Sequence, residues 1–445
     1  MIRLPEKVAY IIRTIQSAGY EAYAVGGCIR DSILGRIPDD WDITTSAKPE
    51  EIKRLFGRTI DTGIQHGTVT VMLEKEGFEV TTYRIDGVYE DSRHPKEVTF
   101  TANLTEDLQR RDFTINAMAY NDEIGLVDVF GGMEDIERGI VRCVGDARER
   151  LTEDALRIMR AVRFSAQLGY RIEEGTVQAI RELAPTLQNI SAERIRTELV
   201  KLVISPHPEY LKDAYEMGIT RVILPEFDVC METEQNNPHH CYTVGEHILK
   251  SMTAVTPDKT LRLAMLFHDI GKPRTLTVDQ EGICHFHGHP AVSEKMCREI
   301  LQRLRFDNHT IQITASLVRY HDYNVEPEFK AVRRALAKIG EEVFPLLFEV
   351  KRADMKAQSD YLRREKEEAL WAAWEVYQKV VEEKQCVSLK DLAVSGKDLI
   401  ENVDMKPGPE LGDMLQYLLE LVLENPSQNE RENLLKAASS RRDFQ

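Results

Sequence analysis

The chain has 445 residues, a length that favours several domains over one core. Hydrophobic residues make up 42% and charged residues 30%, as in ordinary globular proteins, and no run of about eighteen apolar residues exists to span a membrane. The net charge of −16 excludes a protein that coats nucleic acid non-specifically. One nucleic-acid partner stays compatible with that charge, because seven arginines against four acidic residues cluster between Arg138 and Arg163. The seven cysteines lack CxxC spacing, which predicts reduced thiols and a cytoplasmic location.

Residues 1–20 place charged and apolar residues at helical spacing, which predicts an amphipathic helix and not a signal peptide. The next stretch, Ala24–Ser46, predicts a strand, a paired glycine, a short helix, a loop and a second strand that carries Asp40 and Asp42. Alternation along that strand would put both carboxylates on one face, about 7 Å apart, where they can hold a pair of divalent cations. Hard oxygen ligands favour Mg²⁺.

The paired glycine predicts a phosphate site. Gly26 and Gly27 carry no side chains, so a phosphate can approach the backbone, and the following helix N-terminus favours an anion. Arg30, on the first turn, is available for a phosphate oxygen. A GG alone is usually a turn, and a D-x-D alone is usually a solvated surface pair. Together, in this order and spacing, they are a much stronger indication of a nucleotide site. GGCIRD followed by DDWDITT resembles the head of the DNA polymerase β nucleotidyltransferase superfamily, within it the class II tRNA nucleotidyltransferases and the related bacterial poly(A) polymerases.

The residues after this motif predict a helix and then a β-hairpin over 58–84. The resemblance implies a third carboxylate on the second strand, for which Glu79 is the candidate; an exposed strand glutamate is the alternative reading. Ile85–Glu97 is polar and rich in Gly, Pro and Asp, which predicts a loop. In the family, a flexible loop at this point accompanies the switch from adding C to adding A, so its presence favours an enzyme that can add A.

Residues 108–120, LQRRDFTINAMAY, match the family's RRDFTINA motif. The resemblance puts Arg110 and Arg111 near the triphosphate, where a guanidinium fork suits phosphate oxygens. Asp112 and Asn116 have a simpler interpretation, since both side chains can cap or bond a turn. We therefore expect a structural role for Asp112.

Residues 151–168 predict one amphipathic helix with Thr152 as its N-cap. Arg160 and Arg163 follow at steps of three residues, which is close enough on a helix to track a phosphate or a primer. A solvated charged face is the usual explanation of such a run. Because this predicted helix follows the nucleotidyltransferase head, we favour contact of these arginines with a phosphate or a primer.

The start of that helix carries the family's EDxxR motif, and in the family the protein itself reads the base edge there without a nucleic-acid template. A carboxylate accepts from the exocyclic amine of cytosine or adenine, and an arginine donates to base acceptors. The resemblance therefore implies that Asp154 and Arg157 select the base. A second motif, ERxRxE within 191–199, resembles a family helix with a structural role, which pins the base-reading helix to the neck; it comprises Glu193, Arg194, Arg196 and Glu198.

Nine of the twelve histidines lie between His239 and His321. NNPHHCYTVGEH, LAMLFHDIGKP, HFHGHPAVSE and LVRYHD resemble the HD phosphohydrolase superfamily, and side chains on packed helices can converge on one metal. His321 competes with Asp322 as the last ligand, and Lys272 could neutralise a phosphate. A structural role stays open for the histidines at 239, 240, 285 and 287. The implied ligands are His247, His268, Asp269, His289 and Asp322. Imidazole with carboxylate suits Mn, Fe, Ni, Co or Zn.

The resemblances together imply an α+β fold, in which a small mixed β-sheet nucleotidyltransferase head precedes all-α neck, HD and tail domains. The expected domains are a catalytic head at 1–138, a neck that selects the base at 139–225, an HD domain at 235–345 and a helical tail at 346–445. The chain is expected to be helical from Glu326 onward, with a break at 407–409, and the tail is expected to contact tRNA.

The implied activity is template-independent addition of C, C and A from CTP and ATP to the 3′ end of tRNA, with release of pyrophosphate. Mg²⁺ held by Asp40 and Asp42 would activate the RNA hydroxyl and brace the triphosphate, which Gly27, Arg30, Arg111, Arg160 and Arg163 would hold. Three alternatives stay open: an A-adding enzyme or poly(A) polymerase, a chain that is mainly an HD phosphohydrolase with an RNA-binding head, and a non-enzymatic RNA chaperone or scaffold.

Overall fold

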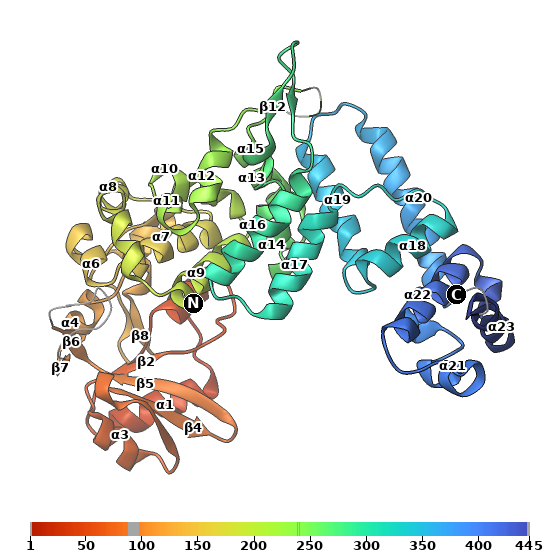
Figure 1. Cartoon of the computed structure of the whole chain (residues 1–445). Coiled ribbons are helices and arrows are strands. Elements are labelled where there is room, and N and C mark those ends of the chain that lie inside the picture. The colour runs from red at the N-terminus through yellow and green to blue at the C-terminus, as the bar shows by residue number, and fades with distance from the viewer. Residues whose placement is uncertain (1, 88–97, 238, 240, 443–445) are drawn as a thin grey trace. The chain divides into compact units, whose positions relative to one another are not determined.

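The computed structural model describes residues 2–87, 98–237, 239 and 241–442. The chain divides into two compact units, residues 1–228 and 229–445 (Figure 1). Residues 88–97 of the predicted loop, and His240, lie outside the described residues. Within the described ranges, no helix is long and apolar enough to cross a membrane.

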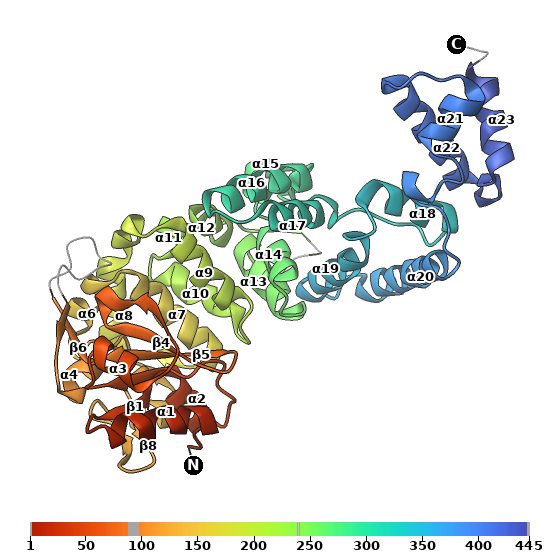
Figure 2. The same ribbon diagram turned by 90° about the horizontal axis from the view of Figure 1, so that it is seen from below.

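The first unit contains a mixed seven-stranded sheet in the order β3-β4-β5-β2-β1-β8-β9. Strand β2 pairs antiparallel with β1 and parallel with β5, so it lies inside the sheet. Figure 2 shows α1 and α3 alongside these strands. The strands are β1 (Ala22–Val25), β2 (Ile43–Thr45), β3 (Thr59–Gly63), β4 (Thr68–Leu73), β5 (Glu76–Thr82), β8 (Ala119–Asn121) and β9 (Gly125–Val127). The helices of this part are α1 (Glu6–Ser17), α2 (Gly27–Ile33), α3 (Pro49–Leu55), α4 (Leu104–Gln109) and α5 (Gly132–Arg138).

The strand predicted to carry Asp40 and Asp42 begins only at Ile43, so that prediction was wrong about the strand. The Asp42 carbonyl still accepts from the Val25 backbone N–H at 3.0 Å. Strand β1 ends there because Gly26, at φ 88°, turns the chain into α2, a conformation that glycine adopts at no steric cost. Pairing cannot continue back to Asp40, and both carboxylates lie in the segment that leads into the sheet.

The rest of the first unit is helical apart from two short pairs of strands, β6 (Arg84–Asp86) with β7 (Val98–Phe100), and β10 (Ile140–Val141) with β11 (Arg171–Ile172). Helix α12 contains the boundary between the two units. The helices are α6 (Ala147–Glu153), α7 (Leu156–Leu168), α8 (Glu174–Leu183), α9 (Ala192–Val203), α10 (Leu211–Glu216), α11 (Thr220–Ile223) and α12 (Pro225–Met231).

The helix predicted over 151–168 is two helices, and Thr152 is not its N-cap. Thr152 lies inside α6, whose N-cap is Asp146. The chain becomes extended at Asp154, with φ −139° and ψ 104°, and an Asp154 carboxylate oxygen accepts from the Leu156 backbone N–H at 3.0 Å. The acidic side chain therefore bonds the first backbone N–H of the next helix, because aspartate competes with helical backbone hydrogen bonds and favours helix ends.

The second unit is a set of packed helices with one small hairpin, β12 (Thr277–Val278) with β13 (Cys284–His285). The predicted break at 407–409 is confirmed, since α22 begins at Pro409. The last three helices bury their own apolar core, which includes Leu399, Leu418 and Leu434. The helices are α13 (Val244–Ala254), α14 (Lys259–Phe267), α15 (Lys272–Thr275), α16 (His289–Arg303), α17 (Asn308–Tyr320), α18 (Phe329–Ile339), α19 (Phe344–Ala357), α20 (Arg363–Glu382), α21 (Gly396–Val403), α22 (Pro409–Glu424) and α23 (Arg431–Arg442). The α+β fold predicted from sequence is confirmed.

Candidate active site and metal centre

Two of the predicted carboxylates share a pocket at the head sheet. Asp42 precedes β2, and Glu79 stands on the neighbouring strand β5, where residue 43 pairs with residue 80. The same pocket is lined by Arg110 and Arg111. Asp40 is exposed and lies outside this lining. The pocket combines hard anionic ligands with guanidinium groups, as a metal-bound triphosphate requires.

Asp42 and Glu79 both have raised pKa values. Although Asp42 reaches solvent, the surrounding protein atoms raise its pKa, Arg111 opposes this shift, and Asp40 adds to it. Burial also raises the pKa of Glu79, with Asp42 and Asp40 contributing. A cation bound between carboxylates relieves such repulsion of like charges. The three carboxylates therefore fit a hard divalent ion, although among the described residues they do not form one of the groups whose ligand atoms lie within 4.8 Å of one another.

The paired glycine is packed against an arginine. A Cβ atom added at Gly26 would lie 2.9 Å from an Arg111 terminal nitrogen, so a side chain there would displace the guanidinium. Gly27 begins α2, as the glycine motif predicts. Arg30 is buried, and its guanidinium donates to both carboxylate oxygens of Asp31 at 2.9 Å and to Asn116 Oδ1 at 2.6 Å. These contacts hold Arg30 in place beside the glycines.

The EDxxR motif contacts the backbone of the RRDFTINA motif directly. Arg157 Nη2 donates to the Arg110 carbonyl oxygen at 3.0 Å, and Arg157 Nη1 donates to the Arg150 carbonyl oxygen at 2.9 Å and to Glu153 Oε2 at 2.5 Å. Arg157 is buried, so these contacts fix its orientation. A single guanidinium thus connects the EDxxR and RRDFTINA motifs.

The other base-reading candidate is held by the ERxRxE helix. Asp154 accepts from Arg194 Nη2 of α9 at 2.7 Å, and both side chains are partly exposed. The arrangement agrees with the structural role expected for this motif, because Arg194 joins α9 to the break between α6 and α7.

Asp112 is at the centre of a buried polar network, as its expected structural role requires. Its carboxylate accepts from Arg160 Nε at 2.7 Å and from Asn116 Nδ2 at 3.1 Å. Burial alone would raise the pKa of Asp112, but Arg160 and Asn116 outweigh burial and hold it far below its usual range. Asn116 in turn accepts from Arg30, so the network runs from α2 to α7. Arg160 is thus placed by Asp112.

Arg163 lies in the interior of the first unit. Its side chain forms an ion pair with Glu198 at 2.6 Å and stacks over Phe164, with 3.7 Å from the guanidinium carbon to the ring centroid. Burial lowers the pKa of Arg163 to about 10. The pair joins α7 to α9.

Replacing Glu198 by glutamine is expected to destabilise the chain by about 3 kcal/mol, because the buried Arg163 charge would lose its counter-ion. Unfolding by urea, followed by tryptophan fluorescence, measures the change. The matched control is Glu182→Gln, which breaks an exposed ion pair with Arg148 and should leave the unfolding midpoint unchanged. Equal midpoints for the two variants would contradict the prediction.

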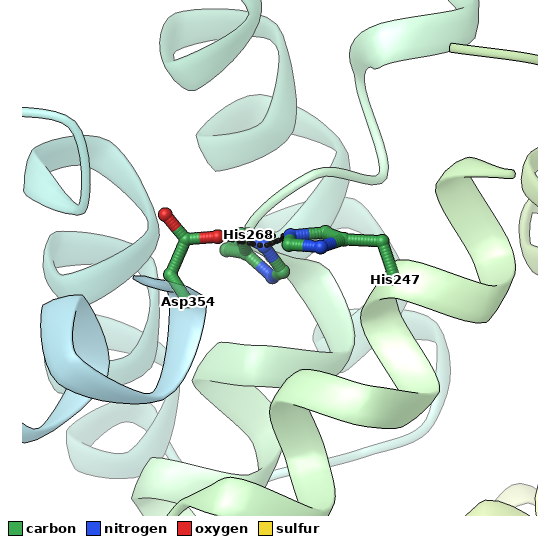
Figure 3. Close-up of side chains that lie close together, drawn as sticks. All are labelled: His247, His268 and Asp354. Atoms are coloured by element: carbon green, nitrogen blue, oxygen red, sulfur yellow. Dashed lines mark hydrogen bonds and ion pairs between the residues drawn. The ribbon is translucent and has the colours of Figure 1, made fainter. Parts of the chain in front are cut away.

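The second unit gathers four histidines and several carboxylates. His247 from α13, His268 at the end of α14 and Asp354 from α19 place ligand atoms within 4.8 Å of one another (Figure 3). Asp269, His289 and His321 form a second such set. Together these residues are called the histidine cluster.

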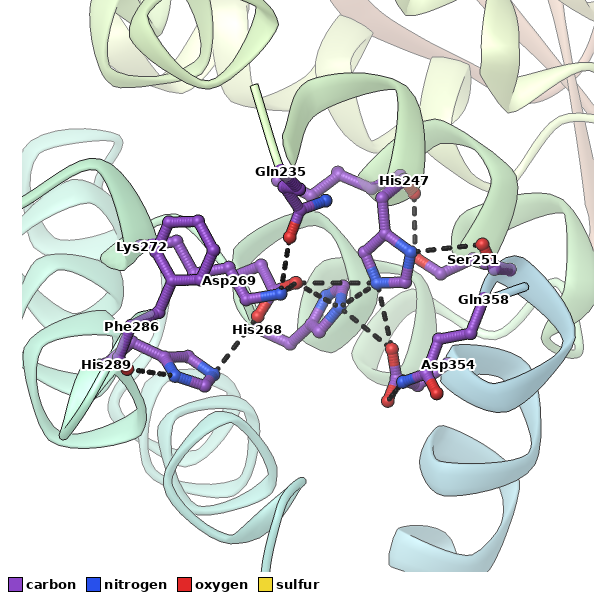
Figure 4. Close-up of polar contacts among 12 residues, drawn as sticks. Gln235, His247, Ser251, His268, Asp269, Lys272, Phe286, His289, Asp354 and Gln358 are labelled. Atoms are coloured by element: carbon purple, nitrogen blue, oxygen red, sulfur yellow. Dashed lines mark hydrogen bonds and ion pairs between the residues drawn. The ribbon is translucent and has the colours of Figure 1, made fainter. Parts of the chain in front are cut away.

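One carboxylate joins the two sets. Asp269 Oδ2 lies 3.4 Å from His247 Nε2 and 3.3 Å from His268 Nε2, whereas Oδ1 lies 3.2 Å from His289 Nε2 (Figure 4). Burial alone would raise the pKa of Asp269, but His268 and Lys272 hold it well below its usual range. Each oxygen of one buried carboxylate therefore faces a different pair of imidazoles.

The other ring nitrogen of each histidine contacts a backbone carbonyl. The Nδ1 atoms of His247, His268, His289 and His321 lie 3.2, 2.7, 2.9 and 2.8 Å from the carbonyl oxygens of residues 357, 265, 286 and 318. A carbonyl can only accept, so Nδ1 of each ring carries a proton, and in the neutral Nδ1–H tautomer Nε2 is the atom that can bind a metal. This tautomer is the one that metal-binding histidines adopt, and the donor set fits a transition metal.

Asp354 was not predicted from the sequence, and His321 was left as an alternative to Asp322 for the last ligand position. Asp354 is on α19, a helix that was predicted as part of the tail, and its Oδ1 lies 2.8 Å from His247 Nε2. Asp322 lies 3.4 Å from His289 Nε2 and is 54% exposed, so it adjoins the second set beside His321. Lys272 Nζ lies 2.7 Å from Asp269 Oδ2. His285, for which a structural role stayed open, pairs instead with an aspartate of its own hairpin.

Family models match three parts of the chain. Residues 22–142 match the poly A polymerase head domain, which contains the pocket described above. Residues 169–231 match a probable RNA- and SrmB-binding site of polymerase A, and residues 275–438 match a tRNA nucleotidyltransferase domain 2. The chain thus carries the head domain of a nucleotidyltransferase.

Full-length relatives define the family more narrowly. A CCA-adding enzyme of Enterococcus faecalis is 34% identical over 438 residues, which cover 98% of this chain and 96% of the relative, and one of Limosilactobacillus reuteri is 35% identical over 432 residues, which cover 96% and 94%. A crystal structure of the Bacillus stearothermophilus CCA-adding enzyme in complex with CTP aligns with a TM-score of 0.73 and 29% identity, covering 100% of this chain and 99% of that one. The chain belongs to the CCA-adding enzyme family, and the resemblance to the class II tRNA nucleotidyltransferases is confirmed.

Proposed function

We propose that this chain adds C, C and A to the 3′ end of tRNA from CTP and ATP, and releases pyrophosphate. One contact carries the proposal: Arg157 donates to the carbonyl oxygen of Arg110, whose side chain lines the pocket with Asp42 and Glu79. A base reader and a triphosphate site are thereby held in fixed relation, as template-independent selection of a nucleotide requires. Family membership supports the same activity.

Some of the proposed residues would bind the metal ions, and others would orient the triphosphate. Asp40, Asp42 and Glu79 would hold Mg²⁺, which when bound neutralises phosphate charge and acidifies the attacking hydroxyl. Arg111 and the backbone at Gly27 would orient the triphosphate for in-line displacement, while the network through Asp112 holds Arg30 and Arg160 in the same region. The tRNA end would be recognised by shape and backbone.

Primer extension tests the proposal. Transcripts of tRNA that end before CCA, and transcripts that end in CC, are incubated with Mg²⁺ and with CTP, ATP or both. Addition of two C from CTP and then one A from ATP is the expected result. Extension of only the CC-ended transcript, or a long A tail, would instead assign an A-adding enzyme or a poly(A) polymerase, and no extension would favour the histidine cluster as the main activity.

Asp154→Ala is expected to relax base selection. The variant removes the carboxylate that would accept from the amine of C or A, an interaction worth about 1–3 kcal/mol of discrimination. The preference for CTP and ATP over UTP and GTP, measured as ratios of kcat/KM, should fall by about tenfold or more. Asp146→Ala is the matched control, because Asp146 also caps a helix, by accepting from the Glu149 backbone N–H at 3.0 Å, but belongs to neither motif. An unchanged ratio in Asp154→Ala would contradict the assignment.

The histidine cluster supports a second function, and we propose that it is a two-metal phosphoester hydrolase site of the HD type. The supporting observation is the single carboxylate of Asp269 between two pairs of Nε2 atoms, on rings whose Nδ1 atoms contact backbone carbonyls. Release of phosphate from small phosphoesters in the presence of Mn²⁺, Co²⁺ or Ni²⁺, and its loss in His268→Ala, tests this function. Absence of hydrolysis by the wild-type chain with every metal would reject it.

A further inference from the structure

A buried carboxylate on α4 links the elements of the nucleotide pocket. The Asp107 side chain is 0% exposed, and its Oδ1 accepts from Arg110 Nε at 3.0 Å and from Arg110 Nη2 at 2.7 Å. Its Oδ2 accepts from the Thr44 hydroxyl at 3.0 Å and lies 3.8 Å from Arg111 Nη2. The Arg84 backbone N–H lies 3.4 Å from Oδ1. Each carboxylate oxygen thus engages a different arginine of the pocket.

The partners of Asp107 lie on both the proposed metal-binding segment and the proposed phosphate-binding segment. Thr44 is on β2, two residues after Asp42, so its hydroxyl ties Asp107 to the strand that follows the metal-binding aspartate. Arg110 and Arg111 line the pocket that Asp42 also lines. Asp107 itself does not line the pocket, and it can act only through the residues that it holds.

The carboxylate is ionised. Burial alone would raise the pKa of Asp107, but Arg110 and Arg111 outweigh burial and keep it below its usual value. A charged acceptor fixes guanidinium groups more strongly than a neutral one, and two donors from Arg110 to one oxygen leave that side chain little freedom.

We infer that Asp107 is a positioning residue for nucleotidyl transfer, which sets the directions of Arg110 and Arg111 relative to Asp42 so that both can meet the triphosphate. The inference rests on the proposed function of the head. Its chemistry is directed at phosphate and not at the base, so loss of Asp107 affects CTP and ATP alike.

The chain offers a matched control of the same construction. Asp135 on α5 is 4% exposed, accepts from the Thr114 hydroxyl at 2.6 Å and from Arg142 Nε at 3.1 Å, and lies outside the pocket lining. A role in folding alone predicts the same consequence for Asp107→Asn and Asp135→Asn. A positioning role predicts a difference in phosphate binding.

The experiment measures KM for CTP and for ATP, and inhibition by inorganic pyrophosphate, in wild type, Asp107→Asn and Asp135→Asn, with thermal unfolding recorded for each. We expect Asp107→Asn to raise both KM values and to weaken pyrophosphate inhibition by a shared factor of about ten, whereas Asp135→Asn leaves all three near wild type. Unchanged or tighter pyrophosphate inhibition in Asp107→Asn would overturn the inference. The carboxylate would then only reduce the positive charge of the arginines and would not direct them to the phosphate. Absence of nucleotide addition by the wild type would instead reject the proposed function.

A second variant covers the case in which Asp107→Asn does not fold. Thr44→Val keeps the carboxylate and the shape of the β2 side chain but removes the hydroxyl anchor. A smaller rise in KM, again equal for CTP and ATP, is expected. A change in the CTP to ATP ratio, or no change in either KM, would contradict positioning through Thr44.

Discussion

Replacing Asp42 by alanine is expected to reduce nucleotide addition by more than about a thousandfold, equivalent to roughly 4 kcal/mol of transition-state stabilisation. Asp42 is the carboxylate that combines the pocket lining with repulsion from Asp40 and attraction to Arg111. Without it, Glu79 and Asp40 cannot supply the charge that a pair of divalent ions needs. Single-turnover extension of a tRNA transcript ending in CC, with ATP and Mg²⁺, measures the loss.

Asp39→Ala is the control for this loss. Asp39 is an exposed acid on the same lead-in segment, three residues before Asp42, and it lies outside the pocket lining. The control should extend the transcript at the wild-type rate and unfold at the same temperature as Asp42→Ala. Activity within tenfold of wild type in a folded Asp42→Ala chain would show that the aspartate is not a metal ligand.

The head motifs could be recognised from sequence because their residues are close together along the chain. The paired glycine, the D-x-D and RRDFTINA each act within one turn or one strand end. The errors at Asp42 and Thr152 concern the local backbone: Gly26 ends the partner strand, and Asp154 caps a new helix where hydrophobic spacing predicts a continuous one. Apolar periodicity does not register a break at which the buried face continues on both sides.

Residues that act through tertiary contacts could not be predicted in this way. Asp107 follows Asn103 and Glu106 in the first turn of α4, where acids are explained by the helix dipole alone. Its role depends on the approach of Thr44 from β2. Asp354 did leave a signal, because it occupies a core position on α19 in line with Leu347 and Val350, where a lone acid calls for a buried partner.

Replacing Asp269 by asparagine is expected to abolish binding of two metal ions to the histidine cluster. The neutral amide cannot offer a charged oxygen to both sets, whereas the wild-type carboxylate faces His268 with one oxygen and His289 with the other. Metal analysis after dialysis against Mn²⁺, on chains that also carry Asp42→Ala so that the head site is removed, should fall from two ions per chain to fewer than one. Asp354→Asn, which affects only the set with His247, should retain one ion.

Two further measurements separate metal loss from misfolding. Asp279→Asn removes an exposed aspartate that lies 2.7 Å from His285 Nε2, and it should keep both ions, because this pair is outside the cluster. A chelator should lower the unfolding temperature of the wild type but not of Asp269→Asn, since a ligand at a hundred times its Kd stabilises the folded state by about 2.7 kcal/mol. Nucleotide addition should persist in Asp269→Asn, because the catalytic pocket and the histidine cluster belong to different compact units. Two ions retained in a folded Asp269→Asn chain would show that the carboxylate does not bridge them.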